Sequence, residues 1–125
     1  MSAIQARVIG LIVSAVVIFG SGVWLTSAGR PYAVVLQTVH KLTALAAVIV
    51  SGVTVYQAMR IGALPTAESI VVWVAAVLVI ASFASGGVVS ASDAAPVWVL
   101  WLHRVAPWFA GVLTAVSVYF TAGRA

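Results

Sequence analysis

Cysteine is absent from the 125-residue sequence, and the only carboxylate side chains are those of Glu68 and Asp93. Without cysteine there are no disulfides, no thiolate metal sites and no cysteine nucleophiles. Two carboxylates are too few for a carboxylate-rich metal site. Both lie near the ends of apolar segments, so the buried carboxylate of a proton-coupled small multidrug transporter is also missing. Nucleophilic triads and phosphate-binding loops have no counterpart in the sequence.

Charge is scarce as well. Charged residues make up 6% of the chain, whereas in soluble domains they make up roughly a quarter. Hydrophobic residues make up 64%, and the mean hydropathy is +1.22. The net charge is +4, but the six basic residues are scattered singly along the chain. No basic run is present to follow a nucleic acid. The composition therefore predicts a single domain, residues 1–125, that lies in a bilayer and binds no nucleic acid.

Four apolar segments are long enough to cross a membrane as helices, which takes about 20 residues. They are residues 7–26, 32–59, 69–92 and 96–121. The connections between them are short, so neighbouring helices must run antiparallel. Strands are excluded because the apolar runs do not alternate and an open sheet cannot span lipid. The sequence predicts an all-α membrane protein, a four-transmembrane-helix antiparallel bundle.

The second and fourth segments contain an internal repeat. His40-Lys41 is matched by His103-Arg104, and the tyrosines that follow, Tyr56 and Tyr119, have the same spacing of 63 residues. The repeat therefore indicates a duplicated helix pair. In an up-down bundle both helices start on the same side of the membrane, which puts both imidazoles roughly 10–12 Å below that surface at ~1.5 Å per residue. Ionisable residues inside membrane helices are costly and by default mark function.

Two imidazoles at one depth favour a heme between the helices, with His40 and His103 as the iron ligands. Small residues follow each histidine at i+4, i+7 and i+11, which is the same stripe of the helix. These residues are Ala44, Ala47 and Ser51 in the second helix, and Pro107, Ala110 and Thr114 in the fourth. Alternatively, small residues simply let membrane helices approach closely. Zinc is disfavoured because it needs a third protein ligand and the chain has no third histidine.

Basic residues beside the histidines are candidates for the heme's carboxylates. Lys41 and Arg104 can extend towards the nearer surface and meet the propionates, and Arg30 in the loop above is a third candidate. Alternatively, each of them reaches lipid headgroups.

The distribution of basic residues predicts the orientation. Arg7, Arg60 and Arg124 lie on the side of the termini, and Arg30 lies in a loop on the histidine side. This imbalance predicts a multi-pass protein of the cell membrane with cytoplasmic N- and C-termini. If Lys41 and Arg104 are counted with the histidine side, the basic residues divide three against three.

The stretch FGSGVWLTSAG, residues 19–29, resembles the GGxVRLTGSG ending of the first helix in heme A synthases. A histidine followed by Lys or Arg in helices two and four is also similar to that family. Those enzymes usually have eight helices in two similar halves, and this chain resembles the compact, half-size archaeal type over essentially its whole length.

The resemblance implies oxidation of a methyl group of heme O to the formyl group of heme A, for terminal oxidases. It implies axial ligation of heme iron by His40 and His103, with heme O as substrate and an electron partner such as quinone. A heme O synthase or a terminal oxidase is an implied protein partner. With one histidine pair, a half-size chain must use one site for substrate heme or form a homo-oligomer that supplies two sites.

The sequence departs from the family at Gln37, in the lack of an external cysteine pair and also at Trp24. The glutamate common three residues before the first histidine is replaced by Gln37, and an amide cannot act as a general base. Asp93, the only carboxylate on the histidine side, is the candidate substitute. The arginine of the first-helix motif is replaced by Trp24, and the external cysteine pair of bacterial relatives is absent.

Two other functions stay open. One is a small membrane b-type cytochrome that holds heme b and carries electrons to or from quinone, which the replacement of glutamate by Gln37 favours. The other is a structural or assembly subunit in which the histidines only form hydrogen bonds with neighbouring helices.

Overall fold

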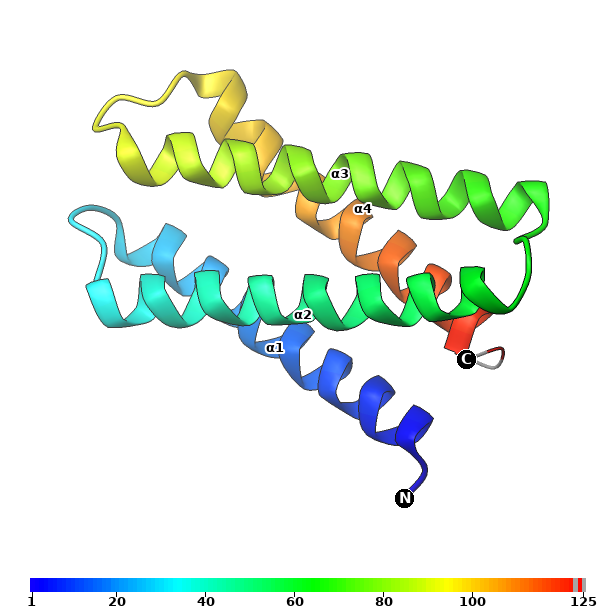
Figure 1. Ribbon diagram of the computed structural model, residues 1–125. Helices are drawn as coiled ribbons and strands as arrows, with labels where there is room; N and C mark the ends of the chain where they lie inside the picture. Colours follow the sequence, from blue (N-terminus) through cyan, green and yellow to red (C-terminus); the bar gives the residue numbers. More distant parts are fainter. Residues whose placement is uncertain (123, 125) are drawn as a thin grey trace. The chain divides into compact units, whose positions relative to one another are not determined.

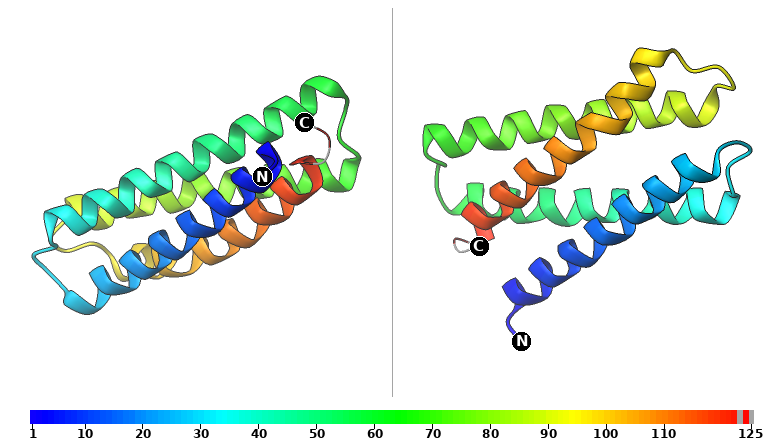
Figure 2. Two further views of the ribbon diagram at one scale, coloured as in Figure 1. Left: turned by 90° about the horizontal axis from the view of Figure 1, so that it is seen from below. Right: turned by 180° about the vertical axis from the view of Figure 1, so that it is seen from behind.

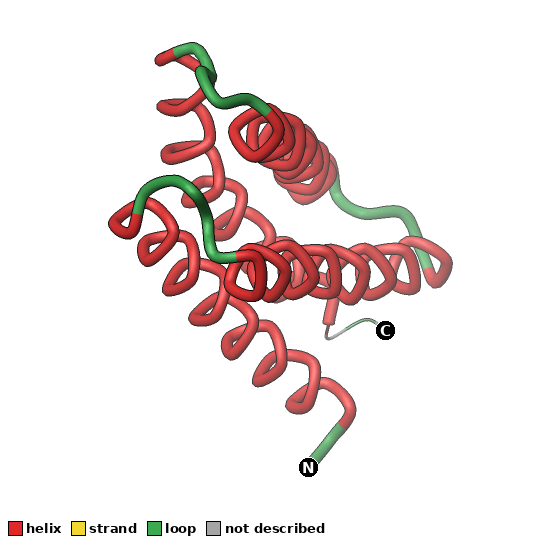
Figure 3. Tube along the Cα trace, turned by 90° about the vertical axis from the view of Figure 1, so that its left-hand side faces the viewer, coloured by secondary structure: helices red, strands yellow, loops and turns green. Residues whose placement is uncertain are grey.

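The computed structural model describes residues 1–122 and 124. In this part of the chain all regular structure is helical, and Figure 3 shows helices joined by short loops. The helices are α1 (Ala3–Ala28), α2 (Val34–Ile61), α3 (Thr66–Ala91) and α4 (Val97–Ala122). Each is 26 or 28 residues long and apolar enough to cross a membrane. At ~1.5 Å per residue such helices exceed the ~30 Å of a hydrocarbon core. The predicted all-α class with four membrane-spanning helices is confirmed.

The chain divides into two compact units, Met1–Thr54 and Val55–Ala125. In the first unit, α1 and the larger part of α2 form an antiparallel hairpin (Figure 1). In the second unit, α3 and α4 form another antiparallel hairpin and lie side by side (Figure 2). Each predicted candidate ligand belongs to one hairpin, His40 to the first and His103 to the second. The assignment of residues 1–125 to a single domain stays a prediction.

α1 begins four residues before the predicted start because Ser2 caps it. The backbone N–H of Gln5 donates to Ser2 Oγ at 3.1 Å, and the Ser2 N–H donates to Gln5 Oε1 at 2.8 Å. This reciprocal capping box satisfies donors that have no partner inside a helix. α1 ends at Ala28 and is followed by Gly29, whose φ of 70° is a backbone conformation that residues with side chains rarely adopt.

Prolines set the starts of α3 and α4. α3 begins directly after Pro65, three residues before the predicted start, and the Ser69 N–H donates to the Pro65 carbonyl at 2.9 Å. α4 begins directly after Pro96, whose carbonyl accepts from the Leu100 N–H at 3.2 Å. Proline suits these positions because it has no N–H that would need a partner.

Hydroxyl groups inside the spans are satisfied within their own helices. In hydrocarbon there is no water to bond a free hydroxyl, so each donates to the carbonyl four residues earlier. The buried residues that form this bond are Ser21, Ser51, Thr54, Ser82, Ser85, Ser117 and Thr121. A bonded hydroxyl still has lone pairs to accept a second hydrogen bond.

Charged side chains near the helix ends also have partners. In the first unit, Arg7 Nη1 donates to Thr54 Oγ1 at 3.4 Å. In the second unit, Arg124 forms an ion pair with Glu68 at 2.7 Å. Glu68, at the start of α3, therefore pairs with a basic residue.

The four spans predict where single cysteines will be labelled, and the natural chain has no cysteine to interfere. In intact cells, a membrane-impermeant maleimide should label Ala33→Cys and Ala94→Cys but not Ala63→Cys. Ala33 lies between α1 and α2, Ala63 between α2 and α3, and Ala94 between α3 and α4. If each helix crosses the membrane once, Ala33 and Ala94 lie on one side and Ala63 on the other. Labelling of Ala63→Cys alone would reverse the predicted orientation. Labelling of only one of Ala33→Cys and Ala94→Cys would contradict four spans.

Candidate functional site

His40 lies on α2, six residues after Val34, and is half-buried. Its Nδ1 atom is 2.9 Å from Ser21 Oγ and 3.0 Å from the carbonyl oxygen of Ile18, both on α1. The ring of His40 is therefore directed at the other helix of its hairpin and is fixed there by two polar contacts.

His103 repeats this arrangement in the second hairpin. It lies on α4, six residues after Val97. Its Nδ1 atom is 3.1 Å from the carbonyl oxygen of Ser82 and 3.3 Å from Ser85 Oγ, both on α3. In both hairpins the acceptors are a serine hydroxyl and the backbone carbonyl three residues before it. Each imidazole lies about 9 Å along its own helix from the helix start. The match in depth between the two helices stays a prediction.

The chemistry of these partners identifies the protonated ring nitrogen. A carbonyl oxygen only accepts hydrogen bonds, so Nδ1 must carry the proton. The serines agree with this, because Ser21 Oγ donates to the Val17 carbonyl at 2.5 Å and Ser85 Oγ donates to the Ala81 carbonyl at 2.7 Å. Each hydroxyl is then an acceptor towards its histidine. In a neutral imidazole the lone pair is therefore on Nε2, the nitrogen that can bind a metal.

A glycine next to each serine lets the imidazole approach the opposite helix. A methyl group at Gly22 would lie 3.2 Å from Cε1 of His40. A methyl group at Gly86 would lie 2.6 Å from Cε1 and 3.1 Å from Nδ1 of His103, which is too close for real contacts. The second histidine therefore depends on its glycine more strongly than the first.

The serines and glycines belong to a repeat that the sequence analysis did not use. FGSG, residues 19–22, corresponds to FASG, residues 83–86. The sequence comparison aligned only the second and fourth helices, and FGSG entered it only through the resemblance to heme A synthases. An alignment of the first and third helices would have shown the matching Ser-Gly pairs. It would not have shown that they face the histidines.

The predicted basic residues lie beside the histidines and in the loop between α1 and α2. Lys41 and Arg104 are exposed, each one position after its histidine. Arg30 is exposed in the loop between α1 and α2, where its guanidinium lies 5.0 Å from the centre of the Tyr32 ring.

Gln37 is half-buried on α2, one turn before His40, and therefore lies near the histidine's face of the helix. Asp93 is exposed in the loop between α3 and α4. The catalytic roles predicted for both residues stay predictions.

The small residues after each histidine are buried or half-buried. Ser51 and Ala110 are buried, and Ala44, Ala47, Pro107 and Thr114 are half-buried. Because the ring at the start of each stripe lies against the other helix of its hairpin, close helix packing accounts for this end of the stripe. The small stripe is thus a weaker argument for a macrocycle than the ring nitrogens.

Among residues 1–122 and 124 there is no group of three or more His, Cys, Asp or Glu side chains that could hold a metal ion. Heme has a smaller requirement, because the porphyrin supplies the equatorial ligands and the protein supplies axial ones. Each hairpin offers one imidazole of the kind that can bind heme iron, His40 on α2 and His103 on α4.

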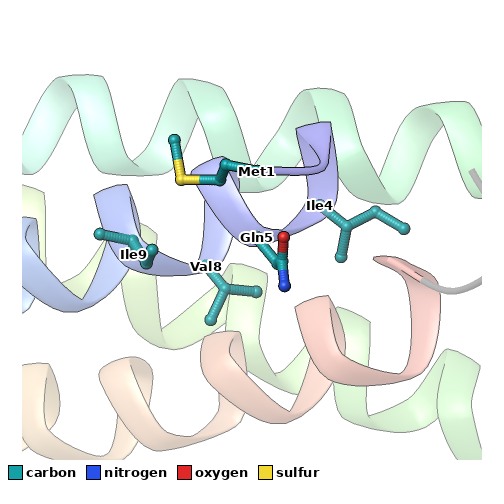
Figure 4. Close-up of a pocket in the computed structure, with 5 residues that line it drawn as sticks. All are labelled: Met1, Ile4, Gln5, Val8 and Ile9. Atoms are coloured by element: carbon teal, nitrogen blue, oxygen red, sulfur yellow. The ribbon is translucent and has the colours of Figure 1, made fainter.

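A hollow at the start of α1 is a poor candidate for a site. It is lined by Met1, Ile4, Gln5, Val8 and Ile9, shown as sticks in Figure 4. Its walls are almost entirely apolar, and they include no histidine or carboxylate side chain.

Comparisons of the chain with models of protein families, with curated proteins and with solved structures found no match. The histidine geometry and the sequence motifs therefore carry the functional proposal.

The glycine contacts predict unequal effects of alanine at two adjacent positions of α3. Gly86→Ala should lower the thermal unfolding temperature in detergent, because overpacking against His103 costs about 1–3 kcal/mol. Gly87→Ala is the matched control, since a methyl group there meets nothing within 4 Å. It should be neutral or stabilising, because alanine is favoured over glycine in a helix by about 0.5–1 kcal/mol.

The first hairpin offers the same comparison. Gly22→Ala should be milder than Gly86→Ala, and Gly20→Ala is its control because a methyl group there also meets nothing within 4 Å. Far-UV circular dichroism during heating measures all four variants. Equal unfolding temperatures for Gly86→Ala and Gly87→Ala would contradict the close approach of His103 to α3.

Proposed function

We propose that this protein is a heme-binding membrane oxidoreductase in which Nε2 of His40 and Nε2 of His103 are the axial ligands of iron. The observation that carries the proposal is that both rings have the same hydrogen bonds. In each ring Nδ1 is bonded to a backbone carbonyl and to a serine hydroxyl. Histidines that bind metals almost always donate their other N–H to such an acceptor, which fixes the tautomer and the ring orientation.

A purely structural role explains one such histidine but explains two less well. A ring that only joins two helices needs one hydrogen bond, and a serine or asparagine supplies it at lower cost in lipid. Here the same ring, serine, glycine and carbonyl occur in both hairpins. The repeat of all four elements favours a role for the remaining ring nitrogen.

Basic residues beside the ligands suit the polar edge of a heme. Lys41 and Arg104 are exposed and lie within the second turn of their helices, and Arg30 lies in the loop that precedes α2. Lys41, Arg104 and Arg30 would supply cations for the propionates, and the apolar part of the helices would hold the macrocycle. When bound, heme iron supplies the redox centre that the protein's own side chains lack.

Within this class we favour heme A synthase activity, with heme O as substrate and heme A as product. The support is the resemblance of residues 19–29 to the family's first-helix motif, together with the histidine–basic pairs at positions 40–41 and 103–104. Ser21 and Gly22, which contact His40, lie inside that motif stretch. Gln37 lies near the histidine's face as a hydrogen-bonding amide, and Asp93 is the carboxylate that would take a proton at the surface.

The second candidate is an electron-carrying b-type cytochrome that exchanges electrons with quinone. Gln37 favours it, because electron transfer needs no general base near the first histidine. A carrier holds heme b and leaves heme O unused, so the two candidates differ in the pigment that they retain.

Heme retention tests the shared part of both candidates. The purified wild-type protein should show a reduced-minus-oxidised pyridine hemochrome spectrum, and His40→Ala and His103→Ala should each lose most of the pigment because an axial ligand is gone. Gln57→Ala, a polar change elsewhere on α2, should keep it. A wild-type protein without heme, with folded and unchanged histidine variants, would establish the structural role instead.

Pigment identity then separates the two candidates. From cells that make heme O and contain an electron-transfer system, the extracted pigment should include heme O and heme A or its hydroxylated precursor. Chromatography of the extract identifies each of them. Heme b alone would favour the carrier and contradict the synthase.

A further inference from the structure

We propose that Ser21 and Ser85 are positioning residues for the iron ligands, acting through Nδ1 of His40 and of His103. The hydrogen-bonding part stands on the geometry of each hairpin, and the part that concerns iron rests on the proposed function. Neither serine would touch iron. Each sets which ring nitrogen holds the proton and how the ring is rotated.

The first step concerns the proton. Each Nδ1–H is shared between a backbone carbonyl and a serine oxygen, at 3.0 and 2.9 Å for His40 and at 3.1 and 3.3 Å for His103. The serine's own proton has carbonyl acceptors on its own helix, four and three residues earlier. With its proton used there, the serine oxygen accepts from Nδ1, and it disfavours the tautomer in which Nε2 holds the proton and cannot bind iron.

The second step concerns ring orientation. In each hairpin the serine accepts from Nδ1 while the next residue, Gly22 or Gly86, lies against Cε1 of the same ring. The serine therefore bonds Nδ1, and a side chain at the next position would collide with the adjacent ring atom Cε1. These contacts restrict rotation of the ring and set the direction in which Nε2 points.

The third step concerns the metal. A hydrogen bond from Nδ1–H makes an imidazole a more basic ligand, and a more basic ligand stabilises ferric iron relative to ferrous iron. Loss of the serine acceptor should therefore raise the midpoint potential of the heme. Because Ser21 lies closer to its histidine than Ser85 does, at 2.9 against 3.3 Å, Ser21→Ala should have the larger effect.

Controls are available on the same helices. Ser82 is buried on α3 and its hydroxyl donates to the Leu78 carbonyl, so Ser82→Ala removes a buried hydroxyl but keeps the carbonyl that accepts from His103. Ser27 is exposed on α1 and its hydroxyl donates to the Val23 carbonyl. Ser85→Thr and Ser21→Thr retain a hydroxyl and should restore the wild-type behaviour.

The first measurement needs no heme. Protein labelled with 15N-histidine, in detergent micelles without heme, should show both rings with the proton on Nδ1. Ser21→Ala should lower the Nδ1–H to Nε2–H ratio of His40 alone by about fivefold, the worth of one hydrogen bond, and Ser85→Ala should do so for His103 alone. Ser27→Ala and Ser82→Ala should change neither ring.

The second measurement is a redox titration of the heme-loaded protein. Ser21→Ala and Ser85→Ala should raise the midpoint potential, while the two control variants and the threonine variants should not. A midpoint potential at the wild-type value in both alanine variants overturns the proposal. So does an unchanged tautomer ratio in the first measurement.

Failure of the proposed function gives a different result. A wild-type protein that retains no heme overturns that function, and with it the role of the serines towards iron. The tautomer measurement on the same protein still decides whether the serines hold the rings.

Discussion

Hydrogen bonding in a medium without water is the constraint on which this structure depends. A backbone inside lipid satisfies itself by forming helices, but a side-chain hydroxyl or imidazole must find its partner inside the protein. The serines and threonines of the spans do so within their own helices. The histidines use the neighbouring helix instead, so in each hairpin an imidazole joins the two helices.

The same constraint explains why serine and glycine stand next to each other opposite the histidine. An imidazole can reach a backbone carbonyl on another helix only if no side chain separates the two, and glycine provides that space. A serine whose proton is already bonded adds a second acceptor without a second donor. The result is a ring held in one tautomer. A metal ligand needs such a fixed tautomer, whereas a histidine that only joins two helices does not.

The two hairpins present this unit twice, which connects the fold to the proposed chemistry. Under the proposed function each hairpin would supply one imidazole to the iron. Four other residues named for the site are exposed: Lys41, Arg104, Arg30 and Asp93.

Hydropathy and spacing by themselves determined the four spans, the helical class and the place of each histidine along its helix. These depend on chain length and on the 1.5 Å rise, which are the same in any membrane helix. The helix starts were less accurate, because α1 starts four residues early where Ser2 caps it and α3 three residues early where Pro65 admits an extra turn. Only the tertiary structure decided that Ser21 and Gly22 face His40 and that Ser85 and Gly86 face His103. The reason is rotational: which residue faces the neighbouring helix depends on how the two helices of a hairpin are turned about their axes, and that follows from packing and loop geometry rather than from spacing along one helix.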